Sequence, residues 1–368
     1  MAGVLVHEWL ERTGGSENVF ETLSDLFPDA ERYCLWDDSD GRFTGVHESS
    51  LARTPARGKK SVALPLMPIA WRNLPAIEAD WVLCSSHAFA HHARFRGPAR
   101  HAPKLVYAHT PARYVWVPDL DGRGGGLAAR AVSGLLKPLD RRRAQEPVAI
   151  AANSQFVADR IAASWGRDST VIYPPVDVDF FANAAPTLSD AEQAKIDALP
   201  ADYLFGVSRL VPYKRLDLVI EAGVASGVPV VIAGEGPDEA RLRSLAQSRN
   251  ARVEFVGRPS RALLAELYRR ARAVVFAPIE DFGIIPVEAM ASGTPVIANA
   301  IGGAAESVVD GRTGTIMHDW SLGALRDAVE RASAMDPAVC RARAEEFSAS
   351  VFADRIRSWT FAHTGVAA

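Results

Sequence analysis

The stretch that decides the fold is Glu280–Gly293, which reads Glu-Asp-Phe-Gly-Ile-Ile-Pro-Val-Glu-Ala-Met-Ala-Ser-Gly. It directly follows an apolar run, Ala273–Ala277, which has the length and composition of a buried strand. Pro286 suits the first position of a helix and Gly293 suits the end of one. The sequence therefore predicts a strand, a loop and a helix in succession, which is the repeating unit of a parallel α/β sheet.

Two carboxylates flank the loop of this stretch. Glu280 leaves the strand, and Glu288 falls in the opening turn of the predicted helix. Between them, Phe282–Ile285 provides free backbone N–H groups at a helix N-terminus, which attracts phosphate. Two acids beside a phosphate would repel the ligand unless they bound another part of it, and sugar hydroxyls are suitable partners. We therefore predict a ligand that joins phosphate to sugar, as a nucleotide sugar does.

The length and composition indicate a globular protein. The chain has 368 residues, and at about 150 residues per domain this length suggests two domains. Its 48% hydrophobic and 23% charged residues are typical of a protein with a sizeable core. The net charge of −3 is too close to neutral to favour a nucleic-acid partner.

Cysteine usage and hydropathy indicate a cytoplasmic protein. The three cysteines, Cys34, Cys84 and Cys340, form neither a disulfide framework nor a zinc spacing, which fits a reducing compartment. No apolar run approaches the length of a membrane span. Val4–His7 reads as a first strand rather than as a secretory leader.

Charge is distributed unevenly along the chain. Residues 1–50 carry 3 basic and 11 acidic side chains, whereas residues 51–160 carry 17 basic and 7 acidic ones. Within the basic part, residues 51–72 combine the cations Arg53–Lys60 with an apolar segment that contains Trp71. This combination predicts contact with anionic lipid at the inner leaflet. The alternative is a solvated basic face beside a core segment.

Short apolar runs alternate with helical stretches in both halves of the chain. This rhythm predicts two doubly wound α/β domains with parallel sheets, at residues 1–177 and 178–345. Pro174 and Pro175 stiffen the join between them. Ligands of such sheets bind at the carboxyl ends of the strands, so we expect the site in a cleft between the domains.

Several polar residues follow predicted strands and are candidates for that site. Arg209 ends a strand and Lys214 lies in the next loop, where two cations can neutralise a diphosphate. The alternative is two ordinary surface cations. Arg258 follows another strand and could present its backbone to a base.

Two further candidates lie in the first half. Gly14 and Gly15 follow the first strand and let the backbone approach a phosphate closely, although any strand-to-helix turn can carry such a pair. His109 follows the strand Lys104–Ala108 and would lie on the same edge of the sheet.

Two other patterns are assigned no function. Asp-x-Asp occurs at residues 38–40, 119–121 and 177–179, each in a polar turn or linker, and we do not interpret it as a metal site. Arg141–Arg143 reads as a solvated helix face.

Taken together, these residues resemble the retaining glycosyltransferases of family 4, which have the GT-B fold of two facing Rossmann-like domains. The resemblance covers nearly the whole chain. It is carried by the Glu280–Glu288 element and by Val207–Arg215, Gly234–Pro237, Phe255–Arg258, Ser292–Ala298, Gly302–Gly303, Ala152–Ala158 and Val171–Asp177.

Other segments resemble a bacterial subgroup of that family. They are His7–Leu10, Gly14–Glu17 and His109–Pro111. The subgroup builds O-antigen and exopolysaccharide, and several of its members use GDP-mannose. The region 92–150 is shorter than in typical relatives, so the acceptor stays open.

The resemblance implies roles for residues of the second half. Glu288 would bind the ribose hydroxyls, and Glu280 would hold the donor sugar. Arg209 and Lys214 would bind the diphosphate, and Arg258 would flank the base.

It also implies roles outside these side chains. Amides of Gly15, Gly283 and Ile284 would assist at the diphosphate, with Ile285 also at the donor site. His109 would contact the donor sugar near the reacting carbon. Residues 346–368 would form a helix that crosses back to the first domain.

The function implied is transfer of a hexose from a nucleotide diphosphate sugar to a glycan, lipid-linked or small-molecule acceptor, with retention. Mannose from GDP-mannose is favoured over other donors. Because Arg209 and Lys214 can stabilise the leaving diphosphate, no metal and no cofactor is expected. The alternatives are a sugar-nucleotide epimerase of the same architecture, a sugar phosphorylase and a non-catalytic nucleotide-binding module. The oligomeric state stays open.

Overall fold

The structure, a computed structural model, describes residues 2–117, 127–183 and 187–365, and it divides into two units. The first unit comprises Met1–Pro175 and Ser350–Ala368, and the second comprises Val176–Ala349. The sequence placed these boundaries after residues 177 and 345. The Asp-x-Asp pattern at residues 119–121 lies outside the described residues.

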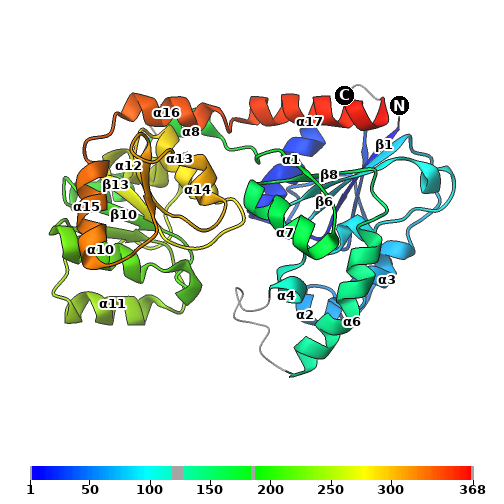
Figure 1. Cartoon of the computed structure of the whole chain (residues 1–368), viewed down its shortest axis with the longest axis horizontal. Helices are drawn as coiled ribbons and strands as arrows, with labels where there is room; N and C mark the ends of the chain where they lie inside the picture. Colours follow the sequence, from blue (N-terminus) through cyan, green and yellow to red (C-terminus); the bar gives the residue numbers. More distant parts are fainter. Residues whose placement is uncertain (1, 118–126, 184–186, 366–368) are drawn as a thin grey trace. The chain divides into compact units, whose positions relative to one another are not determined.

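The described part of the first unit is built on a parallel sheet with the strand order β5-β3-β1-β6-β7-β8-β9 (Figure 1). All these strands are parallel, and the order in which the chain adds them reverses between β1 and β6. This is the switch point where doubly wound folds bind ligands. The strands are β1 (Gly3–His7), β3 (Glu31–Cys34), β5 (Val46–Glu48), β6 (Trp81–Ser86), β7 (Lys104–Ala108), β8 (Ala149–Ala152) and β9 (Thr170–Val171). A separate pair joins β2 (Leu10–Glu11) to β4 (Asp37–Asp38).

Both faces of this sheet are covered, because successive strand residues point to opposite sides. Leu5 and Leu83 pack in a core cluster with Phe20 and Phe352, which belong to α1 (Gly15–Leu26) and α17 (Ala349–Thr364). Val4 and Val82 pack in the opposite cluster, which includes residues of α3 (Met67–Arg72), α6 (Leu127–Arg143) and α7 (Gln155–Trp165). The remaining short helices are η1 (Ser50–Arg53), α2 (Lys60–Ala63), η2 (Ala90–His92), η3 (Pro98–His101) and α4 (Arg113–Trp116).

The second unit repeats the plan. Its described residues form a parallel sheet in the order β12-β11-β10-β13-β14-β15, and the order reverses between β10 and β13. The strands are β10 (Leu204–Val207), β11 (Val230–Ala233), β12 (Val253–Phe255), β13 (Ala273–Phe276), β14 (Val296–Asn299) and β15 (Gly314–Met317). The helices are α8 (Val178–Asn183), α9 (Asp190–Asp197), η4 (Pro212–Lys214), α10 (Asp217–Ser226), α11 (Glu239–Ser248), α12 (Arg261–Arg270), α13 (Ile284–Ala291), α14 (Ala304–Ser307), α15 (Leu322–Ala332) and α16 (Pro337–Glu345).

The predicted fold class, two Rossmann-like parallel-sheet domains, is confirmed. One local prediction is wrong: α13 begins at Ile284, so Pro286 is its third residue and Glu288 its fifth, beyond the opening turn. Proline is still tolerated there because N–H groups of the first turn have no partner inside the helix. Gly283, at φ 85°, provides the sharp change of direction that starts the helix early.

Candidate active site

The switch point of the second unit brings together residues that are far apart in the sequence. β10 pairs directly with β13, so the loops that leave these two strands lie side by side. The first loop carries Lys214 and the second carries Glu280, and the Lys214 ammonium forms an ion pair with the Glu280 carboxylate. Their side chains are only 14% and 22% exposed. A pair shielded from water to this extent interacts more strongly than one on an open surface.

The predicted cations of this loop flank one aromatic ring. The Arg209 Nη2 group donates to the hydroxyl of Tyr213 at 2.8 Å, and the Lys214 Nζ atom lies 5.3 Å from the centre of the same ring. Arg209 is exposed and Lys214 is half-buried. The sequence assigned Lys214 to a diphosphate and Glu280 to a sugar, but it did not predict that the two residues pair. Tyr213 was also missed.

Glu280 is held by close packing of two backbones. The Gly303 N–H donates to the Glu280 carbonyl at 2.9 Å. A Cβ atom at Gly303 would lie 2.2 Å from the Asp281 carbonyl oxygen, and one at Gly302 would lie 2.9 Å from the backbone carbonyl oxygen of Glu280. Only glycine allows the loops after β13 and β14 to approach so closely. This contact fixes the backbone from which the Glu280 side chain projects.

A second glycine contact supports the loop of Arg209. A Cβ atom at Gly234 would lie 1.8 Å from the Ser208 carbonyl oxygen, and one at Gly236 would lie 2.3 Å from that of Leu210. The Leu210 N–H donates to the Glu235 carbonyl at 2.9 Å. The turn 234–236 therefore supports the segment that presents Arg209. Arg258, beyond β12, is exposed.

Glu288 lies on α13 in a partly apolar setting. The hydroxyl of the buried Tyr268, on α12, donates to Glu288 Oε2 at 2.9 Å. Burial raises the pKa of the Glu288 carboxyl to about 7, and the Tyr268 hydrogen bond opposes that rise. Glu288 thus changes charge near neutral pH. Tyr268 carries no sequence signal beyond its place in an amphipathic helix.

The start of α13 places four predicted donor-binding residues. Phe282 and Gly283 are buried, and Ile284 and Ile285, the first two helical residues, are half-buried. Their N–H groups belong to the first turn or precede it, where the helix dipole favours an anion.

The glycine loop of the first unit adjoins a carboxylate that the sequence analysis did not single out. Gly14 precedes α1, and Gly15 is its first residue. The Glu17 side chain is buried and lies against Gly14, where a Cβ atom would come within 2.0 Å of Glu17 Oε2. Ser16 donates to that oxygen at 2.9 Å, and burial raises the pKa of the Glu17 carboxyl. Around Gly15, by contrast, a Cβ atom would meet nothing within 4 Å.

His109 belongs to a group of histidines at the ends of adjacent strands. The Ser85 hydroxyl, in β6, lies 2.8 Å from His109 Nε2 and 3.1 Å from Nδ1 of His7, in β1. Burial, assisted by the nearby His87, lowers the pKa of His109 to about 3, and burial lowers the pKa of His7 strongly. Both imidazoles are therefore neutral at physiological pH.

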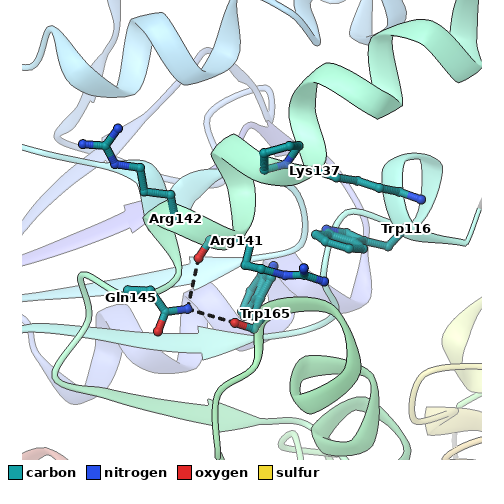
Figure 2. Close-up of a pocket in the computed structure, with 7 residues that line it drawn as sticks. Trp116, Lys137, Arg141, Arg142, Gln145 and Trp165 are labelled. Carbon is teal, nitrogen blue, oxygen red and sulfur yellow. Dashed lines mark hydrogen bonds between the residues drawn. The ribbon is translucent and has the colours of Figure 1, made fainter.

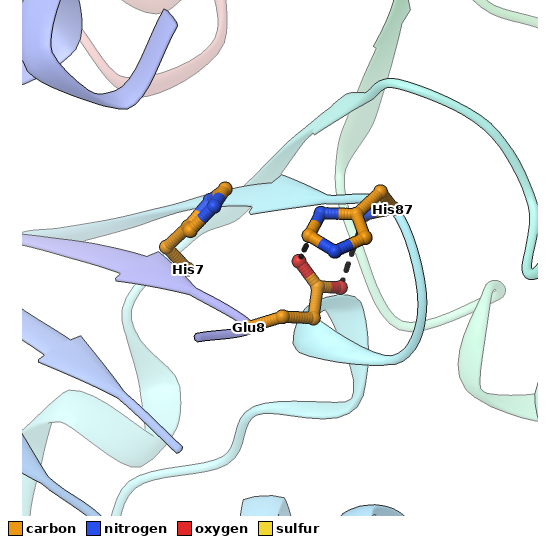
Figure 3. A group of neighbouring side chains, drawn as sticks. All are labelled: His7, Glu8 and His87. Atoms are coloured by element: carbon orange, nitrogen blue, oxygen red, sulfur yellow. Dashed lines mark hydrogen bonds and ion pairs between the residues drawn. The ribbon is translucent and has the colours of Figure 1, made fainter. Parts of the chain in front are cut away.

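Glu8 organises the loop that follows β6 (Figure 3). It is fully buried, and its Oε1 atom accepts the N–H groups of His87, Ala88 and Ala90 at 3.0, 2.8 and 2.9 Å. The Ser86 hydroxyl donates to the same oxygen at 3.1 Å. Figure 3 shows the carboxylate beside the His87 ring, whose Nδ1 lies 3.2 Å from Oε2 without hydrogen-bond geometry. The His87 side chain is 20% exposed. The sequence singled out neither Ser85 nor His87, because neither stands in a recognisable motif.

Two family models match the chain, one in each unit. The model of Glycosyltransferase Family 4 matches residues 13–180, and that of Glycosyl transferases group 1 matches residues 190–347. The chain belongs to glycosyltransferase family 4. Its two Rossmann-like units are those of the GT-B fold.

Solved GT-B structures resemble this family-4 chain over almost its whole length. HepE of Anabaena, in complex with UDP, gives a TM-score of 0.72 at 18% identity, covering 98% of this chain and 100% of HepE. Sucrose-phosphate synthase from Thermosynechococcus elongatus gives 0.69 at 18% identity, covering 98% of each chain. At these identities the likeness concerns the fold.

Curated relatives match over a shorter length. The D-inositol 3-phosphate glycosyltransferases of Mycobacterium tuberculosis and Mycobacterium bovis are 33% identical over 247 residues, 63% of this chain and 49% of theirs. The family-4 chain spans about half the length of these relatives.

Two groups of side chains in the family-4 chain could be considered for a metal ion. Among the described residues they are His7, Glu8 and His87, and His91, His92 and Asp140. In each group the carboxylate already serves the fold. One oxygen of Glu8 has the four donors described above, and Asp140 Oδ2 accepts the indole N–H groups of Trp116 and Trp165, both at 2.7 Å.

The basic segment 51–72 of the family-4 chain is partly paired and partly buried. Arg57 pairs with Asp38 and Glu48, and Lys60 pairs with Glu11. Trp71, which the sequence placed on a lipid-facing surface, is fully buried, because α3 packs it into the core. Val62, Leu66 and Ile69 are 55%, 40% and 60% exposed. None of the described helices is both long enough and apolar enough to cross a bilayer.

Proposed function

We propose that this protein is a retaining glycosyltransferase that moves a hexose from a nucleotide diphosphate sugar to a hydroxyl acceptor without a metal. The observation that carries the proposal is the shielded Lys214–Glu280 pair at the switch point of the second unit. In this pair a cation contacts the carboxylate to which we assign sugar binding, and Glu280 precedes the N-terminus of α13 by a few residues. Family membership supports the reaction type.

The cations stabilise the leaving group. When the bond between the anomeric carbon and the phosphate oxygen breaks, negative charge grows on the diphosphate. Lys214, Arg209 and the amides at the start of α13 are fixed donors for that charge, and donors that act more strongly on the transition state than on the substrate accelerate the reaction. The acceptor oxygen attacks on the face that the leaving group vacates, and its proton passes to the departing phosphate oxygen.

The carboxylates hold the sugars. Glu280 accepts hydrogen bonds from hydroxyls of the transferred hexose, and Glu288 accepts those of the ribose. Because the pKa of Glu288 is about 7, this ribose contact strengthens as the carboxyl ionises. His109, which is neutral, contacts the hexose as a hydrogen-bonding group, and Ser85 sets its orientation.

Two donors deserve priority. GDP-mannose is the donor that the sequence resemblance favours, and we retain mannose as the proposed hexose. UDP-glucose is the alternative, because it is bound by HepE of Anabaena. The acceptor is a glycan, a lipid-linked sugar or a small molecule.

The test is turnover of these donors by the wild type and by Lys214→Ala. Release of nucleoside diphosphate should require the enzyme, and magnetic resonance of the product should show the anomeric configuration of the donor. We expect Lys214→Ala to reduce turnover by about 100-fold, whereas Lys195→Ala, an exposed lysine on α9, should leave it unchanged. Turnover of Lys214→Ala within threefold of wild type contradicts the assigned role.

The same reactions separate the alternatives. An epimerase would convert the nucleotide sugar into its isomer with no acceptor present. A binding module would retain the donor without releasing nucleoside diphosphate. A phosphorylase would depend on inorganic phosphate.

We also propose that the protein is cytoplasmic and contacts anionic lipid through α2 and α3. Val62, Leu66 and Ile69 form an exposed apolar group beside Lys59 and Lys60. In flotation assays the protein should bind anionic vesicles better than neutral ones. Replacing the three apolar residues by Ser should abolish binding, whereas Leu322→Ser, at an exposed leucine of α15, should not. Equal flotation of the triple variant and the wild type would refute this contact.

A further inference from the structure

The first unit contains a pocket that the proposed reaction does not use (Figure 2). Its volume is about 560 Å³, within the range of small-molecule sites. It lies between α4, α6 and α7, and its walls are Trp116, Lys137, Pro138, Arg141, Arg142, Gln145 and Trp165. Arg141 and Arg142 belong to the run that the sequence analysis interpreted as a solvated helix face.

The aromatic wall is rigid. Trp116 and Trp165 both donate their indole N–H to Oδ2 of Asp140, at 2.7 Å each. Asp140 is fully buried, and its other oxygen lies 2.9 Å from His92 Nε2 and 3.0 Å from His91 Nε2. The polar edge of each indole is thus satisfied inside the protein. The wall of the pocket is preorganised, so a ligand need not order these rings.

All the charged side chains that line the pocket are positive. Its lining contains three cations and no carboxylate. Lys137 Nζ and the Arg141 guanidinium lie over the Trp116 ring, 5.5 and 5.3 Å from its centre, which directs both cations to the aromatic wall. Arg141 Nε donates to the Ser164 carbonyl at 2.8 Å. Within the described part of the chain, no acid pairs with Lys137, Arg141 or Arg142.

The neighbouring arginine provides a contrast. Arg143 follows directly on α6, but its Nη1 atom pairs with Glu146 at 2.9 Å, and it does not line the pocket. Glu146 also pairs with Arg72 and Lys104, at 2.8 and 3.0 Å. Glu146, beyond the end of α6, therefore neutralises Arg143, whereas the three cations that line the pocket have no acidic partner among the described residues.

We propose that this pocket binds a phosphate ester, whose negative charge is attracted by Lys137, Arg141 and Arg142 and whose organic group lies against Trp116 and Pro138. Three cations suit a group with two or more negative charges better than a single carboxylate, and arginine binds phosphate oxygens in a two-pronged fashion. The pocket is larger than a phosphate alone requires, and its aromatic wall suits the carbon skeleton of an ester. A soluble sugar phosphate and the phosphate end of a lipid carrier share this chemistry.

The test is titration calorimetry of the whole protein with glucose 6-phosphate, with geranyl diphosphate as a short lipid phosphate, and with glucose as the uncharged control. We expect at least one phosphate to bind and glucose not to bind. The phosphate that binds more tightly shows whether the pocket prefers a soluble sugar phosphate or the phosphate end of a lipid carrier. The absence of binding by both phosphates would overturn the proposal.

Variants locate the binding. The double variant Lys137→Gln/Arg142→Gln changes two side chains that make no hydrogen bond in the described structure, so it should fold normally. It should weaken binding at least tenfold, whereas Arg143→Gln should change it less than twofold. Arg209→Ala, in the other unit, should not weaken it, which separates this pocket from the proposed donor site. If the double variant binds as tightly as the wild type, the ligand lies elsewhere and the proposal fails.

Discussion

The two units place their functional groups in opposite environments. In the second unit, Lys214, Glu280 and Arg209 retain some exposure and interact through charge. In the first, Glu8 and His7 are fully buried and His109 is nearly so. The Ser85 hydroxyl contacts both histidines, and Glu8 accepts hydrogen bonds from the loop that follows β6. A side chain that is exposed to water can bind a ligand. A buried carboxylate whose oxygen already accepts several hydrogen bonds from the protein instead holds the neighbouring backbone in place. Substitution of Glu8 should therefore affect mainly folding, whereas substitution of Arg209 or Lys214 should affect mainly turnover.

The largest effect is expected for Glu8→Ala. It would leave three backbone N–H groups and the Ser86 hydroxyl without their acceptor inside the protein. Each unsatisfied buried group costs about 1–3 kcal/mol, so the free energy of unfolding should fall by roughly 4 kcal/mol or more. Urea unfolding measures this. Glu11→Ala, which removes an exposed partner of Lys60, is the control and should change stability by under about 1 kcal/mol. Equal losses in the two variants would show that Glu8 does not anchor the loop.

The next effect concerns the cation that faces water. Arg209→Ala should reduce kcat by an amount equivalent to about 2–4 kcal/mol, as for the loss of one donor to a developing anion. The melting temperature should hardly change, because Arg209 is exposed and bonds only the Tyr213 hydroxyl among the described residues. Arg243→Ala, on α11, is the matched control. If Arg209→Ala lowers the melting temperature but leaves kcat unchanged, Arg209 serves folding rather than turnover, and the contrast drawn between the two units is wrong.

A smaller effect is expected where the loops after β13 and β14 meet. Gly303→Ala would push a methyl group to 2.2 Å from the Asp281 carbonyl oxygen. We expect a loss of about 1–3 kcal/mol in stability, the cost of overpacking, and weaker donor binding because Glu280 shifts. Gly323→Ala places its methyl in open space within α15 and should stabilise the protein by up to about 1 kcal/mol. Unchanged donor affinity in Gly303→Ala would show that this contact does not position Glu280.

The smallest effect is a shift in pH dependence. The folded-state pKa of Glu288, about 7, lies above its unfolded value, so this group's contribution to stability is complete at low pH and is lost as the pH rises through 7. Donor affinity should change in the opposite sense and increase through the same range, because the ionised carboxylate binds the ribose. Tyr268→Phe removes the hydrogen bond that lowers the pKa, so the midpoint should move upward. Glu288→Gln should abolish the dependence, and a midpoint that persists in it must come from another group.

The sequence predicted the second unit better than the first. The strand, loop and helix around Glu280 have strong local signals, and the fold class follows from them. The Lys214–Glu280 contact was not predicted, because it depends on β10 and β13 being neighbours, which no local pattern specifies. Pro286 misplaced the start of α13 by two residues, because Gly283 turns the chain earlier.

In the first unit the residues that matter are scattered. Ser85 and His87 lie at and just beyond the end of β6, whereas Asp140 lies in α6. They meet His7, Glu8 and His91 only in the folded chain. β3, β5 and β9 were also missed, since they are short and carry charged or polar residues. Trp71 was placed at the surface because its neighbours are basic, yet its ring fills the core.

The glycine contacts between neighbouring loops have a consequence for protein engineering. The turn at Gly302–Gly303 fits against the 280–282 backbone so closely that neither can change shape without the other. Grafting a relative's version of residues 280–283 to obtain a new sugar preference would therefore fail unless residues 300–304 were transplanted with it. In this part of the protein, residues 280–283 and 300–304 can therefore be exchanged only together.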